Sequence, residues 1–167
     1  QTLAGKPLDS DYSGRRVRWE PVYEVTQVKG DGEAHPTLSP TDEFAAGYEL
    51  WDRGNLTLVP KKPGMIAHEY LREALKNGLL LDQQLGANAF KYGMAAGTDT
   101  HNALVAAEED NFYGKFASSE PSAERADENA MKFGDRVVKG WELTAAGDTA
   151  VWATEKTRDG TRDAMRR

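Results

Sequence analysis

The stretch IAHEYLREALKNGLLLDQQLG, residues 66–86, and the following FKYGMAA, residues 90–96, decide the fold class. In the first stretch apolar residues recur three and four positions apart with charged residues between them, which is typical of an amphipathic helix. Gly86 is a normal C-terminal stop for that helix, whereas Gly78 weakens the pattern in its second half. The second stretch is short and apolar and predicts a buried strand. A helix leading directly into a strand is half of an α/β unit, so we expect an α/β fold.

The other elements have weaker signals. β-Branched and aromatic residues predict strands at 17–19 and, more clearly, at 22–28, before a glycine-rich turn at 29–33. The segment from about 30 to 64 has little periodicity, which indicates a long functional or disordered loop with room for one short helix near 42–50. The remaining expected elements are loop and surface helix at 118–129, strands at 137–138 and 150–153, and a helix from 157 onward.

Composition restricts the class of function. The 167 residues suffice for one domain, and the net charge of -6 disfavours nucleic acids and membrane surfaces as partners. The absence of cysteine excludes thiol nucleophiles, thiolate metal sites and disulfides. We find no apolar run of about 18 residues and no basic region followed by an apolar stretch at the N-terminus. We therefore expect a soluble protein, cytoplasmic or periplasmic, without a transmembrane segment or signal peptide.

The triplet Asp99-Thr100-His101, directly after the second predicted strand, is the first candidate for chemistry. In an extended strand end, residues two apart point the same way, so a carboxylate and an imidazole could face one ion. That donor pair suits Zn, Mn or Fe. In α/β sheets and barrels, ligands bind at the carboxyl ends of strands. The alternative is that Asp99 or Thr98 only caps a following helix and His101 is an ordinary polar residue.

The chain has two other histidines. Glu33 and His35 have the same spacing and could supply a carboxylate and an imidazole, or bind substrate, although an exposed loop histidine is the simpler interpretation. His68 lies on the predicted helix, where we expect a surface position.

The remaining polar and aromatic candidates have ordinary explanations. The acidic run 108–110 is expected to be a solvated face, Lys91 and Lys115 surface lysines, and the tryptophans core or loop anchors. We find no glycine-rich nucleotide loop, nucleophile elbow or His-Glu-x-x-His motif, so covalent catalysis has no good candidate.

Several stretches of the chain form a recognisable set. They are PVYEVTQVKGDGEAHP at 21–36, DEFAA at 42–46, REALKNGL at 72–79, GTDTHNAL at 97–104 and AAEEDNFYGK at 106–115. The run from Gly97 to Lys115 is the most specific of them. Together they resemble one bacterial family, catalogued as domain of unknown function 3604 within the superfamily of polymerase and histidinol phosphatase (PHP) metallohydrolases.

The resemblance implies a distorted (β/α) barrel with divalent metal ions at the carboxyl ends of its strands. It implies that Asp99 and His101 match the family's last metal motif and that Glu24 stands near the site, while Glu33 and His35 are weak catalytic candidates. PHP proteins begin with a His-x-His pair, which this chain lacks. We therefore expect residues 1–167 to be a single partial domain, the C-terminal segment of an incomplete barrel.

For the intact protein the resemblance implies hydrolysis of a small phosphorylated substrate, or of another ester, by a metal-bound hydroxide. Cleavage of a carbon–nitrogen or sulfate ester bond is the second option. A non-catalytic structural fragment or interaction module, inactive alone, is the rival from another class. The partner would then be the missing N-terminal half or another copy of the chain.

Overall fold

A computed structural model of the chain describes residues 1–2, 4–27, 30–46, 52, 59–104, 112–119, 122–144 and 147–166. Three α-helices are present in this part, α1 (Ser10–Trp19), α2 (Leu71–Leu85) and α3 (Arg158–Ala164). The strands are β1 (Val22–Glu24), β2 (Thr26–Gln27), β3 (Gly30–Asp31), β4 (Gly93–Ala95), β5 (Asn129–Phe133) and β6 (Arg136–Lys139). Short 3₁₀ turns cover Ile66–His68, Ala117–Ser119 and Trp141–Leu143.

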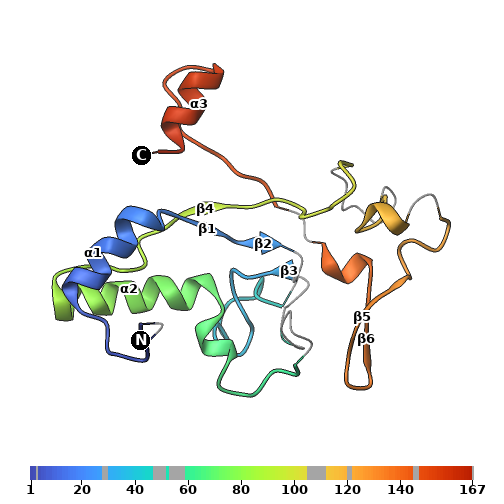
Figure 1. Ribbon diagram of the computed structural model, residues 1–167, viewed down its shortest axis with the longest axis horizontal. Coiled ribbons are helices and arrows are strands. Elements are labelled where there is room, and N and C mark those ends of the chain that lie inside the picture. Colours follow the sequence, from blue (N-terminus) through green and yellow to red (C-terminus); the bar gives the residue numbers. More distant parts are fainter. Residues whose placement is uncertain are drawn as a thin grey trace.

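Strands β1 and β4 pair in parallel, and α2 lies in the connection between them, so the α/β prediction is confirmed. The other pairs, β2 with β3 and β5 with β6, are antiparallel hairpins. Figure 1 shows β1 and β4 running together above α2, the β5–β6 hairpin projecting at one end, and α3 standing apart on an extended segment. The described residues form these small sheets and no closed barrel.

Helix α1 corrects the expected strand at 17–19. The Asp9 side chain accepts a hydrogen bond of 2.7 Å from the Tyr12 backbone N–H and caps the helix. Two ion pairs at helical spacing follow, Arg15 with Asp11 and Arg16 with Glu20. These charges four residues apart are the helix signal in a segment that carries few apolar residues.

Helix α2 was predicted well at its end and less well at its start. It ends before Gly86, which adopts a left-handed φ of 67°, but it begins at Leu71 because residues 66–68 form a 3₁₀ turn. The helix continues through Gly78. A Cβ there would lie 2.2 Å from Asn88 Oδ1, so glycine permits the chain after the helix to pack closely.

The strand predicted at 137–138 is confirmed within β6, whereas those predicted at 22–28 and 90–96 are shorter than expected. The strand expected at 22–28 divides into β1 and β2, and the expected glycine turn contributes β3, which pairs Thr26 with Asp31. Strand β4 covers only three residues of 90–96 and is not buried, since Met94 is 57% exposed. Residues 150–153 form no strand, and the described part of 118–129 holds a 3₁₀ turn in place of a helix.

The hydrophobic core of the described residues is small. Phe133, Val138 and Leu143 form one cluster in and beside the β5–β6 hairpin, and Tyr70 and Leu71 are buried at the start of α2. The accessible surface of the chain is 11404 Å². A compact protein of this mass exposes about 8,200 Å². The chain therefore leaves much more surface uncovered than a compact domain does.

The three tryptophans that the structure describes do not anchor a core. Trp19 is 71% exposed, Trp141 43% and Trp152 97%, whereas Trp51 lies outside the described residues. The described part of the expected helix at 42–50 is turn, and its remainder also lies outside the described residues. Among the described helices, none combines the length and the apolar character that crossing a membrane requires.

Candidate functional site

The candidate site lies at the carboxyl end of the parallel strand pair. Glu24, the last residue of β1, is in register with Ala95, the last residue of β4, so both strands end at the same edge. Thr26 then ties the next loop to this edge. Its hydroxyl donates to the Gly97 carbonyl and accepts a hydrogen bond of 2.9 Å from the Gly97 N–H. The segment that carries the Asp-x-His motif is thereby fastened at its first residue.

Contrary to the predicted extended strand end, Asp99 does not continue the strand. Its φ is 55°, in the left-handed region that aspartate and asparagine enter more readily than most residues. The backbone therefore turns at Asp99, and the simple rule that residues two apart face the same way fails here. The described residues after the motif, through Leu104, form no helix, so the capping alternative is not realised there either.

The turn brings the His101 ring back onto the backbone of Asp99. His101 Nδ1 lies 2.7 Å from the Asp99 carbonyl oxygen. A carbonyl oxygen only accepts, so Nδ1 carries the proton of this hydrogen bond, and in the neutral ring Nε2 then has the lone pair. The ring is exposed and packs against Phe116 with 5.5 Å between ring centroids. Among the described residues Nε2 makes no hydrogen bond, and it is the atom available to a ligand.

Lys115 is the residue that sequence reasoning missed. It was expected at the surface, yet its side chain is fully buried. Its ammonium donates to the Asp99 carbonyl oxygen and, at 3.0 Å, to Asp99 Oδ2. Burial lowers the pKa of Lys115, and the hydrogen bond and negative charge of Asp99, with the charge of Glu24, oppose that shift. The one sequence signal was that Lys115 ends the most family-specific run.

Two further contacts fasten the segment of Lys115 to the motif. The His101 N–H donates to the Lys115 carbonyl at 2.9 Å. Asn102 uses its side-chain NH₂ to reach the carbonyls of Tyr113 and Gly114, at 3.1 and 2.8 Å. Residues 101–102 and 113–116 therefore form one bonded unit around the candidate site.

The donors at this site fit half of a metal centre. His101 offers a neutral Nε2 whose other ring nitrogen is held by a carbonyl, which is the usual support of a metal-binding histidine. The Asp99 side chain is 24% exposed, and Oδ2 is shared with Lys115 while the carboxylate has further acceptor positions. Protein metal sites normally use three or four ligands, and no group of three His, Asp or Glu residues occurs within the described ranges.

The second predicted pair, Glu33 and His35, has a different environment. Glu33 accepts two hydrogen bonds from Arg72, at 2.6 Å from Nη2 and 3.1 Å from Nε, and Arg72 also pairs with Asp42. The salt-bridged carboxylate is therefore a support of the loop at the start of α2. No hydrogen bond or ion pair links this group to Asp99 or His101 in the part of the chain described.

His35 is buried and not on an exposed loop, which corrects the simpler expectation. It is 4% exposed, and its ring lies 5.2 Å from that of Tyr70. Its Nδ1 is 2.7 Å from Thr37 Oγ1, and its Nε2 is 3.7 Å from Asp52 Oδ2. Such a histidine is part of the packing of this region.

The remaining candidates lie apart from the site. His68 is on the surface in the first 3₁₀ turn, as expected, and Lys91 is exposed. The acidic run 108–110 lies outside the described residues.

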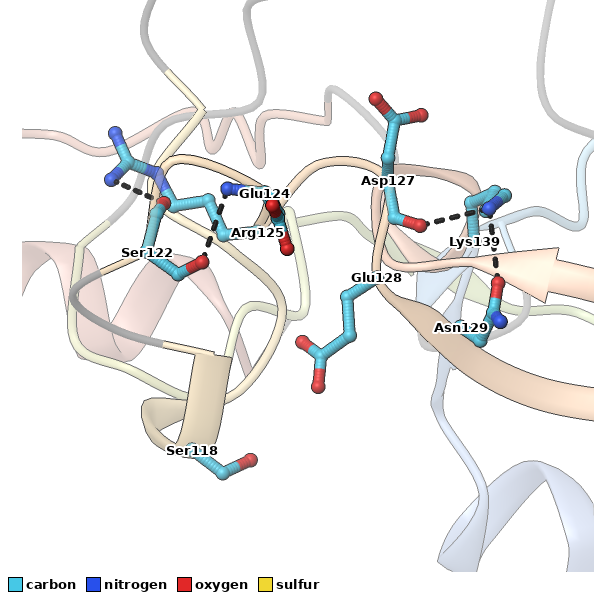
Figure 2. A pocket seen from close by; sticks show the side chains of 8 residues that line it. All are labelled: Ser118, Ser122, Glu124, Arg125, Asp127, Glu128, Asn129 and Lys139. Atoms are coloured by element: carbon cyan, nitrogen blue, oxygen red, sulfur yellow. Dashed lines mark hydrogen bonds between the residues drawn. The ribbon is translucent and has the colours of Figure 1, made fainter.

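A pocket of about 500 Å³ lies elsewhere, between the 3₁₀ turn at 117–119 and the base of the β5–β6 hairpin. Figure 2 shows Glu128 pointing toward its middle. Its two cations are already engaged, since Arg125 Nε donates to the Phe112 carbonyl at 2.8 Å and Lys139 Nζ to the Asp127 carbonyl at 2.9 Å. None of the predicted site residues lines it. The lining residues are Ser118, Ser122, Glu124, Arg125, Asp127, Glu128, Asn129 and Lys139.

Comparison with known proteins identifies the family. No curated protein and no solved structure matched the chain. A family model described as "Protein of unknown function (DUF3604)" matches residues 1–167, the whole of the sequence. The chain therefore belongs to the DUF3604 family.

Proposed function

We propose that this chain supplies half of the metal centre of a metal-dependent hydrolase, with Asp99 and His101 as its metal ligands. The observation that carries the proposal is the 2.7 Å contact between His101 Nδ1 and the Asp99 carbonyl oxygen. That contact leaves Nε2 of an exposed ring free to bind a metal and fixes the ring that holds it. The carboxylate of Asp99 is the second donor.

The placement of these residues also supports the proposed barrel. In this proposal β1 and β4 are late strands of a distorted PHP-like (β/α) barrel. Their parallel pairing and the position of Glu24 and Asp99 at or after strand ends agree with the way such barrels build their sites. Glu24 is a further carboxylate close to these residues, because its charge acts on Lys115. The remaining ligands come from outside the group formed by Asp99 and His101.

A bound Zn, Mn or Fe ion would activate water for attack and stabilise negative charge on the substrate oxygens. The chain's own residues prepare the site. His101 in its neutral form offers a nitrogen, and Asp99 offers a negative charge. Lys115 holds the turn at Asp99 by hydrogen bonds to its carbonyl and its carboxylate. Glu33 and His35 lie outside this centre in the proposal, because Arg72 pairs with the former and packing encloses the latter.

The test is a metal titration of the chain by calorimetry, with Zn²⁺ and Mn²⁺ in separate experiments. We expect measurable binding that falls at least about tenfold in the Asp99→Ala/His101→Ala variant, because both ligands are removed. His68→Ala is the matched control and should bind as the unaltered chain does, since His68 is exposed and distant in sequence. Equal affinity of the double variant and the unaltered chain would refute the proposed ligands.

The proposed bond is a phosphoester in a small substrate, and a substrate panel tests it. Phosphate monoesters, phosphodiesters, sulfate esters and amides would be offered to the metal-loaded intact protein, in which the remaining ligands complete the centre. Hydrolysis confined to the phosphate esters and lost in the double variant is the expected result. Hydrolysis of the sulfate ester or the amide alone would show that the enzyme cleaves that bond and not a phosphoester.

A second candidate function is that of a structural or interaction module. It is favoured by an accessible surface of 11404 Å², against about 8,200 Å² for a compact chain of this mass. The partner would be the polypeptide that carries the remaining ligands, or another copy of the chain. Absence of both metal binding and hydrolysis would favour this function over the first.

A further inference from the structure

We infer that Lys115 is a positioning residue, which fixes the orientation and the tautomer of His101 through the carbonyl oxygen of Asp99. The inference rests on the proposed function, since the orientation of Nε2 matters only if a ligand binds there. It is argued from a single carbonyl oxygen that accepts two hydrogen bonds. The Lys115 ammonium and His101 Nδ1 both donate to the Asp99 carbonyl.

The three residues form a closed set of contacts. Lys115 Nζ bonds the carbonyl and carboxylate of Asp99, the Asp99 carbonyl bonds the His101 ring, and the His101 N–H bonds the Lys115 carbonyl at 2.9 Å. The Phe116 ring contacts both ends, with Lys115 Nζ 5.9 Å from its centroid and the His101 centroid at 5.5 Å. Moving any one of the three therefore disturbs the other two.

The burial of Lys115 argues against a purely structural role, because burying an ammonium costs free energy. A fully buried ammonium loses its hydration, and an apolar residue of similar shape would fill the same space without that cost. What the ammonium adds is two directed hydrogen bonds onto Asp99, whose φ of 55° is uncommon for a residue other than glycine although aspartate adopts it more readily than most. Lys115 therefore holds Asp99 in the turn that presents its carbonyl to His101.

Without Lys115 the turn at Asp99 loses the donor that compensates for its backbone conformation. The carbonyl can then rotate away, and the His101 ring has no fixed acceptor for Nδ1–H. Metal affinity is an ambiguous readout of this change, because removing a nearby positive charge favours a cation while loss of ring orientation disfavours it. The tautomer of His101 responds to the orientation alone.

The experiment is long-range ¹H–¹⁵N NMR of the metal-free chain, with its three histidines assigned through single variants, at a pH where the rings are neutral. We expect His101 to be a single tautomer with the proton on Nδ1. In Lys115→Met we expect a mixture of both tautomers, whereas Lys91→Met, an exposed matched control, should leave the signal unchanged. Retention of the Nδ1–H tautomer in folded Lys115→Met would overturn the inference.

Folding of the variant is checked by the signals of Tyr70 and Leu71, which are buried at the start of α2 and make none of the contacts described for Lys115, Asp99 and His101. If Lys115→Met does not fold, the unaltered chain still decides the matter. Two donor protons that each lie about 2 Å from one oxygen are within about 4 Å of each other. We therefore expect a nuclear Overhauser effect between the Lys115 ammonium and His101 Hδ1, and its absence would overturn the inference.

The two proposals fail separately. A chain that binds no metal but shows the fixed tautomer and its loss in Lys115→Met would refute the metal site and retain the role of Lys115. A chain that binds metal through Asp99 and His101 but shows mixed tautomers without metal would refute the role of Lys115 and retain the site.

Discussion

The two Asp/Glu-x-His segments of this chain share one spacing and have opposite environments. In the 99–101 segment the His101 ring is exposed, its Nδ1 is held by a backbone carbonyl, and the buried Lys115 bonds Asp99. In the 33–35 segment the ring is 4% exposed and the carboxylate is paired with Arg72. The difference shows that one spacing leads to two environments, because tertiary packing decides whether the histidine is enclosed or exposed.

The two cations act differently. The Arg72 guanidinium is a planar fork that bridges two carboxylates, Glu33 and Asp42, and joins the loop to the start of α2. The Lys115 ammonium is a compact charge that bonds both the carbonyl and the carboxylate of one residue, Asp99. The first arrangement stabilises packing between segments, and the second shapes a single turn.

The largest effect on stability should come from truncating His35, and the same truncation of His101 is its comparison. His35→Ala removes a buried ring packed on Tyr70, and we expect the free energy of unfolding to fall by about 2–3 kcal/mol. His101→Ala removes an exposed ring and should change it by less than about 0.5 kcal/mol. Urea denaturation measures both values. Similar losses in the two variants would contradict the contrast between packing and site.

Thr26→Val tests the anchor of the 99–101 segment. Valine keeps the shape but loses both hydrogen bonds to Gly97, and we expect a loss of about 1–2 kcal/mol because the Gly97 N–H is left without its partner. Faster amide exchange at Gly97, but not at His35, would locate the effect. Thr149→Val, an exposed neighbour bonded to Ala96, is the matched control and should have a smaller effect. Equal protection of Gly97 in Thr26→Val would contradict the anchoring role.

Asp31→Asn tests the other segment. Burial raises the pKa of Asp31, against hydrogen bonds from the backbone N–H groups of Glu33 and Ala34. Since the folded state then resists ionisation, the charged form costs stability at neutral pH, and that cost disappears as pH falls below the ordinary value of 3.8. Asparagine retains an acceptor for the Glu33 N–H, so we expect Tm at pH 7 to rise by about 2–4 °C.

The gain in Asp31→Asn should vanish in acid, and thermal unfolding monitored by circular dichroism at several pH values would follow it. Asp135→Asn, at an exposed position, is the control for removal of one negative charge. A gain that persists below pH 3.8, or that the control reproduces, would show that desolvation of Asp31 is not its cause.

The smallest effect should come from Arg72→Met. Its ion pairs are partly exposed, so water screens them, and we expect Tm to fall by about 2 °C or less. The Phe44 N–H and then Arg72 lower the pKa of Asp42, so this carboxylate stabilises the fold above pH 3.8 and loses that effect as pH falls through its lowered folded-state value. The fall of Tm in acid should be smaller in Arg72→Met than in the unaltered chain. An unchanged dependence of Tm on pH would contradict a role for the Arg72–Asp42 pair.

The part of the fold that sequence predicted best is α2, because its periodic leucines and terminal Gly86 are local signals. Helix α1 was missed because its stability comes from a cap and charges four residues apart, with few apolar residues to mark a face. The strands were placed approximately, and the pairing of β1 with β4 joins residues distant in the chain, which no local pattern specifies. The barrel itself stays a prediction.

By itself, the sequence determined the α/β class, the helix end at Gly86, the family, and the position of Asp99 and His101 just after a strand. Only the tertiary structure decided that Asp99 turns left-handed, that Lys115 is buried beneath it, and that His35 is enclosed by Tyr70. Periodicity and end signals depend on neighbours a few residues apart and are therefore visible in the chain. The Lys115–Asp99 contact joins residues 16 apart and depends on burial, which no local pattern specifies.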